Sequence, residues 1–385
     1  MLSVIGGRVL GEGGVLREAG VTIDAGHISA IGNEDAAGKS VLDASGYLVL
    51  PAIIDLHGDA FERQIMPRPG VHFPLDLALQ ETDRQMISNG IATAYHGITY
   101  SWEPGLRGRE TALELLNALA ALQDRLACDT RVHLRWETFN TPAAGEIAGW
   151  IEEGRIDLLA FNNHLEMMQR ELDNAQKLVK YAGRAGISGA DFIKLVHDVA
   201  ARADQVEGAK ALLAACAVDH GIPCASHDDE TAEMRAGYHQ LGVGICEFPV
   251  NEETARYAID HGDPVVLGGP NILRGGSHCA RLNAAESAKA GLCSILTSDY
   301  YYPSLLQAPF RLVNDGIVDF QTAWNMVSRN PAQAAGLTDR GEVREGLRAD
   351  LVIIDDSDPA CPRVMATIVR GRPVYMFDAD YRICA

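Results

Sequence analysis

The sequence predicts an α/β fold, a (β/α)8 TIM barrel that carries a small β-sandwich domain built from both termini. Eight strand-like runs that end in polar residues alternate with helical patterns through the centre of the chain. Short β-prone runs broken by Gly and Asp stand at both ends. A length of 385 residues suits one large barrel with an accessory domain. We expect residues 51–345 to form the barrel, and residues 1–50 with 346–385 to form the small domain.

The first barrel strand is predicted from the apolar run at residues 48–56, which ends in His57-Gly58-Asp59. Such a run is typical of a strand buried on both faces. Because side chains i and i+2 of a strand point the same way, we expect His57 and Asp59 to project together. A nitrogen and a carboxylate that converge could form half of a divalent-metal site. Taken alone, the tripeptide is better explained as a polar turn that ends a strand.

The other barrel strands are predicted where further runs end in polar residues, with helical patterns such as 110–122 and 208–219 between them. An open doubly wound sheet is the alternative fold, but no GxGxxG motif follows an early strand. The longest interval, 165–221, holds more helix than one crossover needs, and it could cover the active site or form an oligomer contact. The seven runs span residues 90–96, 131–137, 158–164, 222–227, 244–249, 264–269 and 294–299.

The composition limits the partners of the protein. A formal net charge of -19 argues against nucleic acid and anionic membranes, although a local basic cluster or a metal could still bind an anionic substrate. No stretch approaches the length of a membrane helix, and the N-terminus lacks the features of a signal peptide. The eight cysteines form no CxxC pair and are expected to be buried, reduced thiols. We therefore predict a cytoplasmic protein, with a homo-oligomer possible.

The predicted strand ends are rich in side chains that bind metal ions. Any one of them could be a hydrogen-bonded core group, but their recurrence at successive strand ends favours a shared site. Nitrogen and oxygen donors without cysteine favour one or two divalent ions such as Zn, Mn or Mg. The candidate residues are His57, Asp59, His96, Glu137, His164, His227, Asp228, Asp229 and Asp299.

Two arginine-bearing loops follow predicted strands and suggest an anionic substrate. The glycine-rich segment 268–278 contains Arg274, Ser277 and His278, and Arg68 stands between two prolines in segment 66–70. Exposed backbone N–H groups and a guanidinium suit phosphate oxygens, although a glycine-rich loop alone is weak evidence. The tyrosines that follow Asp299 either line the pocket or pack.

These features resemble the amidohydrolase superfamily, in particular its members that act in phosphonate utilisation. The terminal β domain and segments 50–57 and 346–352 resemble the superfamily as a whole. The usual first motif of the superfamily is His-x-His, and here Asp59 stands at its second position. No lysine falls at a strand end, so we favour Glu137 over a carboxylated lysine as the bridging ligand. The segments that resemble the phosphonate-utilisation members are 57–59, 67–69, 225–229, 247–249, 269–278, 298–301 and 330–332.

The resemblance implies a metal-dependent hydrolase that cleaves α-D-ribose 1-methylphosphonate 5-triphosphate to the 5-phosphate and pyrophosphate with metal-activated water. Asp299 is then the expected base. The alternatives are hydrolysis of a C–N bond, as in a deaminase, deacylase or cyclic amidase, and a binding module without catalysis. The expected metal ligands are His57, Asp59, Glu137, His164, His227 and Asp299, and the expected substrate-binding residues are Arg68, Arg274, Ser277, His278 and Asp228.

Overall fold

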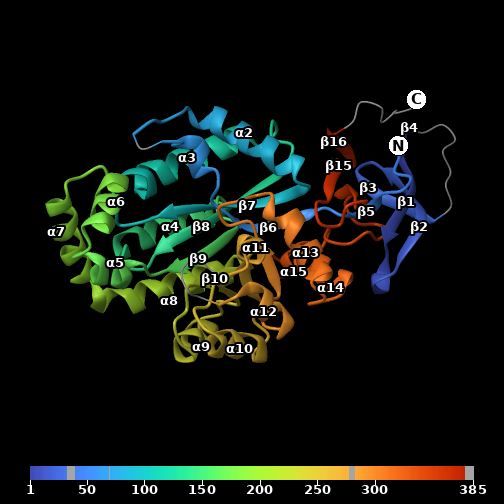
Figure 1. Ribbon diagram of the computed structural model, residues 1–385. Coiled ribbons are helices and arrows are strands. Elements are labelled where there is room, and N and C mark those ends of the chain that lie inside the picture. The colour runs from blue at the N-terminus through green and yellow to red at the C-terminus, as the bar shows by residue number, and fades with distance from the viewer. Residues whose placement is uncertain (33–39, 69, 277–281, 378–385) are drawn as a thin grey trace.

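The structure, a computed structural model, describes residues 1–32, 40–68, 70–276 and 282–377 (Figure 1). Among these residues, eight parallel strands lie side by side in sequence order and form the predicted barrel. The strands are β6 (Ile53–Gly58), β7 (Ile91–Tyr100), β8 (Asp129–Glu137), β9 (Leu158–Asn162), β10 (Cys224–His227), β11 (Ile245–Glu247), β12 (Val265–Gly268) and β13 (Ile295–Thr297).

The barrel closes between its last and first strands, beside the His57-Gly58-Asp59 tripeptide. The backbone N–H of Asp299 donates to the His57 carbonyl, and the N–H of Asp59 donates to the Asp299 carbonyl, both at 2.9 Å. A Cβ at Gly58 would lie 2.9 Å from a carboxylate oxygen of Asp55 and 3.0 Å from the ring of Tyr302. Only glycine therefore fits between the ligand candidates at this position.

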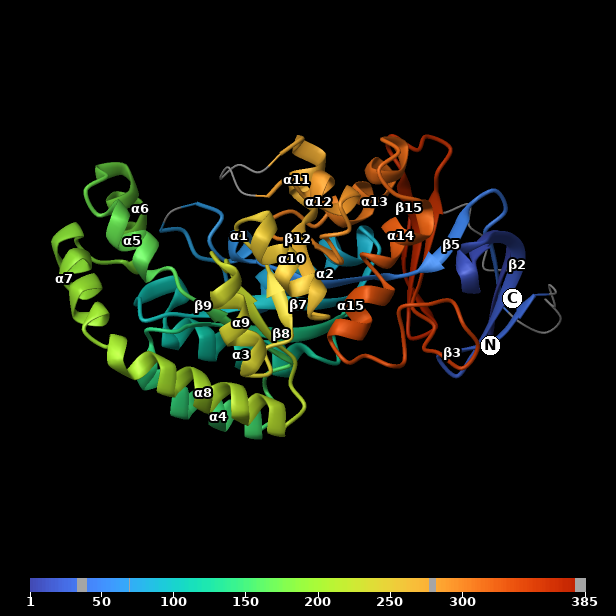
Figure 2. The ribbon, with the colours of Figure 1, turned by 90° about the horizontal axis from the view of Figure 1, so that it is seen from below.

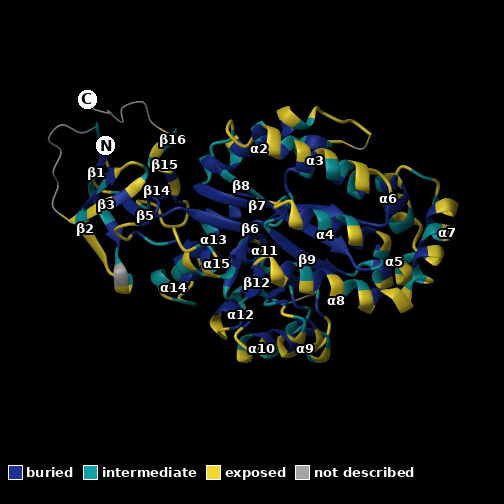
Figure 3. Ribbon diagram, turned by 180° about the vertical axis from the view of Figure 1, so that it is seen from behind, coloured by how far each residue is buried: buried dark blue, intermediate teal, exposed yellow. Residues whose placement is uncertain are grey.

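Helices cover the outside of the barrel, and Figure 3 shows its strands buried behind helices whose outer faces are exposed. Apolar side chains such as Leu56, Tyr95 and Leu158 fill its interior. The elements outside the long interval are α1 (Glu62–Ile65), α2 (Leu75–Ser88), α3 (Arg109–Leu122), α4 (Ala144–Glu152), α9 (Ala232–Gln240), α10 (Glu252–Asp260), α11 (Gly269–Arg274), α12 (Ala284–Lys289), α13 (Ser304–Asn314), α14 (Phe320–Asn325), α15 (Arg329–Ala334) and the 3-10 turns η1 (Glu12–Gly14), η2 (Gly105–Arg107) and η3 (Thr141–Ala143).

The long interval between β9 and β10 folds into four helices. The first three lie at the end of the molecule farthest from the termini (Figures 1 and 2). They share a small apolar core in which Tyr181 and Phe192 pack near Trp102 of the segment that follows β7. This core holds the helices beside the barrel mouth. The helices are α5 (Leu165–Glu171), α6 (Ala175–Ala185), α7 (Gly189–Ala200) and α8 (Ala203–Asp219).

The two ends of the chain build a separate mixed sheet, as predicted for a domain made from both termini. Its order is β16-β15-β14-β5-β1-β2-β3, with β4 paired in parallel to β1. The domain boundaries themselves stay a prediction. The strands are β1 (Leu2–Leu10), β2 (Leu16–Asp24), β3 (His27–Gly32), β4 (Ser40–Asp43), β5 (Leu48–Pro51), β14 (Leu351–Asp355), β15 (Arg363–Val369) and β16 (Arg372–Met376).

The run at residues 48–56, predicted as one strand, is divided between the two sheets. β5 pairs with β1 and β14 of the terminal sheet, whereas β6 pairs with β7 of the barrel. The break falls at Ala52, whose N–H donates to the carbonyl of Asp350, while the next N–H, from Ile53, donates to that of Gly90. Hydropathy cannot reveal this break because both halves are buried.

Two properties of the whole chain bear on the sequence predictions. Within the described residues, no helix has the length and apolar character needed to span a membrane. The six cysteines described there are free, and four of them are buried as predicted, whereas Cys216 is half-buried and Cys361 is exposed. The cytoplasmic location and a homo-oligomer stay predictions.

A buried ion cluster ties the barrel to the segment that leads into β14. Asp129 at the start of β8 accepts hydrogen bonds from Arg340 and from Nη1 of Arg348, the latter at 2.8 Å. Both guanidinium groups also donate to the hydroxyl of Thr93, at 3.0 and 3.3 Å. The side chains of the two arginines are only 5% and 9% exposed. Arg340 also pairs with Asp339 and Arg348 with Asp350, and Asp129 is the carboxylate that the two arginines share.

We predict that Asp129→Asn lowers the free energy of unfolding by about 2 kcal/mol, because two buried guanidinium groups lose their shared anion and keep only Asp339 and Asp350 as partners. Burial raises the pKa of Asp129, but Arg131, Arg340 and Arg348 outweigh it, so the pKa falls below 3.8. The contribution is therefore complete above about pH 5 and is lost as the pH falls below that value. Urea denaturation at pH 7 measures the loss.

The matched control is Glu81→Gln, which removes an exposed ion pair with Arg84 and should cost less than about 0.5 kcal/mol. Equal stability of the Asp129→Asn and Glu81→Gln proteins would contradict the assigned role of the buried cluster.

Candidate metal centre and active site

A cavity of about 310 Å³ opens at the C-terminal ends of the barrel strands. This is the end at which barrel enzymes carry their active sites. Most of the predicted ligands line it. They are His57, Glu137, His164, His227, Asp228 and Asp299. Asp59 joins them, because ligand atoms of His57, Asp59 and Asp299 lie within 4.8 Å of one another.

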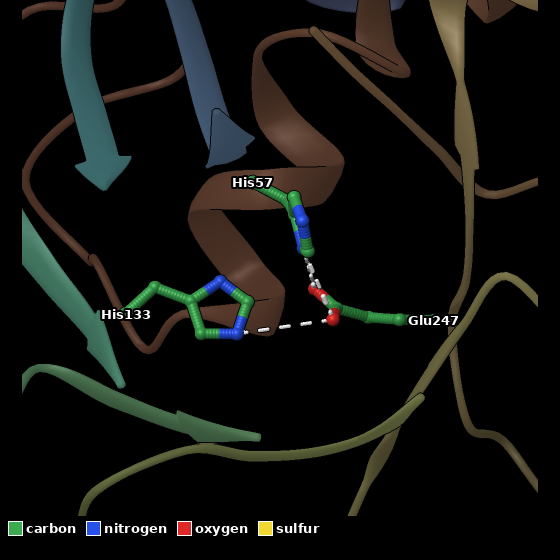
Figure 4. Close-up of side chains that lie close together, drawn as sticks. All are labelled: His57, His133 and Glu247. Carbon is green, nitrogen blue, oxygen red and sulfur yellow. Dashed lines mark hydrogen bonds and ion pairs between the residues drawn. The ribbon is translucent and has the colours of Figure 1, made fainter. Parts of the chain in front are cut away.

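Glu247, which the sequence reasoning did not select, lies among three imidazoles. Figure 4 shows it with two of them, His57 and His133. Its Oε2 atom is 3.2 Å from Nδ1 of His57, 3.2 Å from Nδ1 of His227 and 3.8 Å from Nε2 of His133. All four side chains are buried. We refer to His57, Asp59, His133, His227, Glu247 and Asp299 as the donor ring.

His133 gives the clearest sign that the donor ring fits a cation. Its Nδ1 donates to the carbonyl of Leu56 at 2.9 Å, so in the neutral ring Nε2 carries a lone pair. That buried Nε2 has no hydrogen-bond partner and faces the Glu247 carboxylate, so two acceptors oppose each other. Two ligands of one tetrahedral zinc ion stand roughly 3.4 Å apart. A divalent ion between them would satisfy both atoms.

The protonation states of the donor ring also suit a metal. Burial lowers the pKa of His133, and it lowers the pKa of His57 and His227 well below 6.5, so all three imidazoles are neutral at neutral pH. Burial would raise the pKa of Glu247, but its interactions with His133 and His227 and the charge of Arg135 outweigh burial and lower it. Neutral imidazoles around an ionised carboxylate are a favourable set for Zn²⁺ or Mn²⁺.

The two aspartates of the donor ring crowd negative charge at one edge. Burial and then the neighbouring Glu62 raise the pKa of Asp59 to about 6. Burial and then Asp59 raise the pKa of Asp299 to about 7. A bound cation would remove this repulsion.

Glu137 and His164 form a pair beside the donor ring. Glu137 accepts from the backbone N–H of His164 at 3.1 Å and pairs with its Nδ1 atom. This pairing outweighs burial and lowers the pKa of Glu137 to about 2. Nε2 of His164 lies 3.9 Å from Asp228, and His164, His227 and Asp228 form a further group that could bind metal. Glu137 is thus paired with one imidazole, whereas Glu247 faces three. The prediction that Glu137 is the bridging ligand stays a prediction.

Arg135 places a buried cation next to the donor ring. Its Nη1 lies 3.5 Å from Asp59, and its Nη2 lies 3.4 Å from Nε2 of His227. Gly97 of β7 faces this guanidinium, since a Cβ there would lie 3.2 Å from Cδ of Arg135. The absence of a side chain at Gly97 thus leaves room for Arg135, which lines the cavity.

Three strand ends carry non-glycine residues with positive φ. These are Asp228 (62°) after β10, Phe248 (52°) after β11 and Asp299 (54°) after β13. Such conformations cost free energy and persist where the surrounding structure imposes them, which is frequent at functional sites. All three residues line the cavity.

Two predicted candidates lie away from the site. His96 precedes Gly97, whose Cα faces the interior, so its own ring points outward and packs 5.0 Å from the ring of Phe61. β7 continues to Tyr100, so His96 is not at a strand end. Asp229 accepts from Ser226 and pairs with Arg235 in a fully buried network. These two residues are therefore structural.

The two arginines predicted to bind the anionic substrate do not line the cavity. Within the described residues, the cavity lining includes neither Arg68 nor Arg274. Arg274 instead donates to the hydroxyl of Tyr300 at 3.2 Å. Ser277 and His278 lie outside the described residues. Of the tyrosines that follow Asp299, Tyr302 is buried packing and Tyr301 is half exposed, so neither lines the pocket.

Comparison with known proteins identifies the family. A family model described as the amidohydrolase family matches residues 111–375. The chain is 34% identical over 342 residues to α-D-ribose 1-methylphosphonate 5-triphosphate diphosphatase of Escherichia coli (strain K12), across 86% of this chain and 90% of that protein. The chain belongs to the amidohydrolase family. The predicted resemblance is thereby confirmed, and a hydrolase of this family generally uses divalent metal ions.

Other amidohydrolase relatives are more distant. The chain is 22% identical over 351 residues to adenine deaminase of Gluconobacter oxydans (strain 621H), across 88% of this chain but 52% of that protein. Two solved structures share the fold. Dihydropyrimidinase from Brevibacillus agri NCHU1002 has a TM-score of 0.66 at 14% identity, covering 97% of this chain and 95% of its own. 5-Methylcytosine deaminase from Klebsiella pneumoniae, liganded with 5-fluorocytosine, has a TM-score of 0.65 at 15% identity. That comparison covers 98% of this chain and 98% of the deaminase chain.

We predict that Glu247→Gln lowers the affinity for zinc at least tenfold, because it removes the anion that faces three imidazoles. Glu137→Gln is the matched control and should lower the affinity less, since His164 already engages that carboxylate. Metal analysis after equilibrium dialysis measures both, and circular dichroism checks folding. Full zinc binding by a folded Glu247→Gln protein would show that Glu247 is not a ligand.

Proposed function

We propose that this amidohydrolase hydrolyses α-D-ribose 1-methylphosphonate 5-triphosphate to the 5-phosphate and pyrophosphate. The observation that carries the proposal is the 34% identity to the diphosphatase with this substrate in its name, across most of both chains. The arrangement of the cavity supports it, because a set of metal donors adjoins basic side chains suited to a phosphorylated substrate.

The donor ring is the proposed metal site, with Glu247 in place of the predicted Glu137 as the bridging carboxylate. A divalent ion held there would supply Lewis acidity, which favours ionisation of water and withdraws charge from a phosphoryl oxygen. His164 and Asp228, on the cavity side of His227, could complete a second position.

Asp299 is the proposed general base. It lies at the end of β13 and faces the cavity beside His57 and Asp59, where its carboxylate can accept a proton from water in the cavity. It would accept a proton from the water that attacks the α-phosphorus. The bond from that phosphorus to the bridging oxygen then breaks, and the oxygen leaves with pyrophosphate. Arg135 would balance charge that develops on the phosphoryl group.

Hydrolysis of a C–N bond is the alternative. The adenine deaminase relative favours it, although at lower identity and over only about half of that protein's length. A carbonyl or amidine substrate would need the same water and the same base but no cationic subsite.

Product analysis distinguishes the two reactions. The zinc- or manganese-loaded protein is supplied with the ribose triphosphate, nucleoside triphosphates, N-acyl amino acids and nucleobases, and pyrophosphate and ammonia are both assayed. We expect pyrophosphate from the ribose triphosphate and no ammonia from any substrate. Ammonia from a nucleobase without pyrophosphate release would overturn the proposal.

We predict that Asp299→Asn lowers kcat for pyrophosphate release by about 10²–10⁴-fold, because the amide cannot accept the proton. Bound metal should persist, since the imidazoles and Glu247 remain. The control is Asp198→Asn on the exposed surface of α7, which should keep full activity. Near-full activity of Asp299→Asn would show that another group is the base.

A further inference from the structure

One face of α6 forms part of the wall of the active-site cavity. Lys177, Lys180, Tyr181 and Arg184 all line it, and their spacing of three, four and seven residues places them on one side of the helix. We refer to these four residues as the α6 basic face. The opposite part of the same cavity contains His57, His227 and Asp299 of the donor ring. A molecule in the cavity would thus meet metal donors and fixed cations together.

Two cations of the α6 basic face already have carboxylate partners. Arg184 donates through Nε to Glu103 at 3.1 Å and through Nη2 to the same carboxylate, whose side chain is only 2% exposed. Lys177 lies 3.3 Å from Glu171, which also accepts from the hydroxyl of Tyr181. These bonds fix the orientation of the helix against the barrel mouth.

Lys180 differs from its neighbours. It lines the cavity, it is exposed to solvent, and no ion pair joins it to any acid in the part of the chain that the structure describes. An ammonium that remains solvated can bind a phosphate without first leaving another anion. The formal net charge of -19 repels anions at long range, so a cation inside the cavity has a large effect on their binding.

We propose that the α6 basic face is the subsite for the oligophosphate of the substrate, with Lys180 as its main contact and Lys177 as the second. The proposal rests on the proposed function and makes these lysines specificity-determining residues. The phosphoryl group that is attacked lies at the donor ring, and the pyrophosphate portion extends toward α6. A neutral nucleobase would gain nothing from either lysine.

The test measures binding and turnover in the metal-loaded full-length protein. Lys180→Ala should raise KM for the ribose triphosphate about tenfold and change kcat less than about twofold, because the contact is made equally in the ground and transition states. It should also weaken binding of inorganic pyrophosphate, measured by calorimetry, about tenfold. Lys180→Arg should recover most of both losses. Lys194→Ala, an exposed lysine of α7 outside the cavity lining, is the control and should change neither.

The outcomes separate this proposal from the proposed function. Hydrolysis of the ribose triphosphate with unchanged KM and pyrophosphate binding in Lys180→Ala would overturn the subsite and leave the function standing. Absence of that hydrolysis in the wild-type protein, with pyrophosphate binding that still depends on Lys180, would overturn the function and support the subsite. A loss in Lys194→Ala equal to that in Lys180→Ala would also overturn the subsite, because it would reflect general charge.

Discussion

The central constraint in this structure is a buried carboxylate that faces neutral imidazoles. Glu247 is ionised and fully enclosed, yet the groups nearest to it are three histidines whose charged forms are disfavoured by burial. A buried anion is expensive even beside the guanidinium of Arg135, and a buried Nε2 lone pair opposite it adds to the cost. A divalent cation relieves both at once. The arrangement of barrel strands, glycines and flanking charges serves to keep these groups in place.

The barrel explains how distant segments supply one centre. His57, His133, His227, Glu247 and Asp299 come from or directly follow five different strands, and parallel strands bring their C-terminal ends to the same edge. The hydrogen bonds between the first and last strands fix Asp299 beside the His57-Gly58-Asp59 tripeptide. The missing side chains at Gly58 and Gly97 make room for Asp55 and Arg135. The same backbone contacts thus close the barrel and bring the donor ring together.

Much of this arrangement could be predicted from the sequence because it follows from short-range patterns. All eight barrel strands overlap the runs from which they were predicted, and the family resemblance holds. Glu247 was overlooked although it lies in the run 244–249, because that run ends two residues later, at Pro249, while β11 ends at Glu247. His133, Arg135 and Glu137 occupy every second position of β8. The two-residue period of a strand would therefore have placed all three on one face. His96 was misassigned because β7 runs four residues further than its hydropathy suggests.

Other features depend on tertiary packing that no local pattern reveals. The lysines of α6 read as a solvated helix face. They line the cavity because α6 is held beside the barrel mouth. An ion pair joins Arg184 to Glu103, and Tyr181 packs against Phe192. The arginine loops suggested an anion site at Arg68 and Arg274, whereas the lining cations come from elsewhere. The residue types therefore indicated an anionic substrate, but the sequence could not show which cations lie near the cavity.

Anomalous diffraction from crystals grown with zinc or manganese tests the central claim most directly. We predict a peak bounded by Glu247 and the imidazoles of His57, His133 and His227. A peak confined to Glu137 and His164, or no peak within the donor ring at saturating metal, would contradict the account.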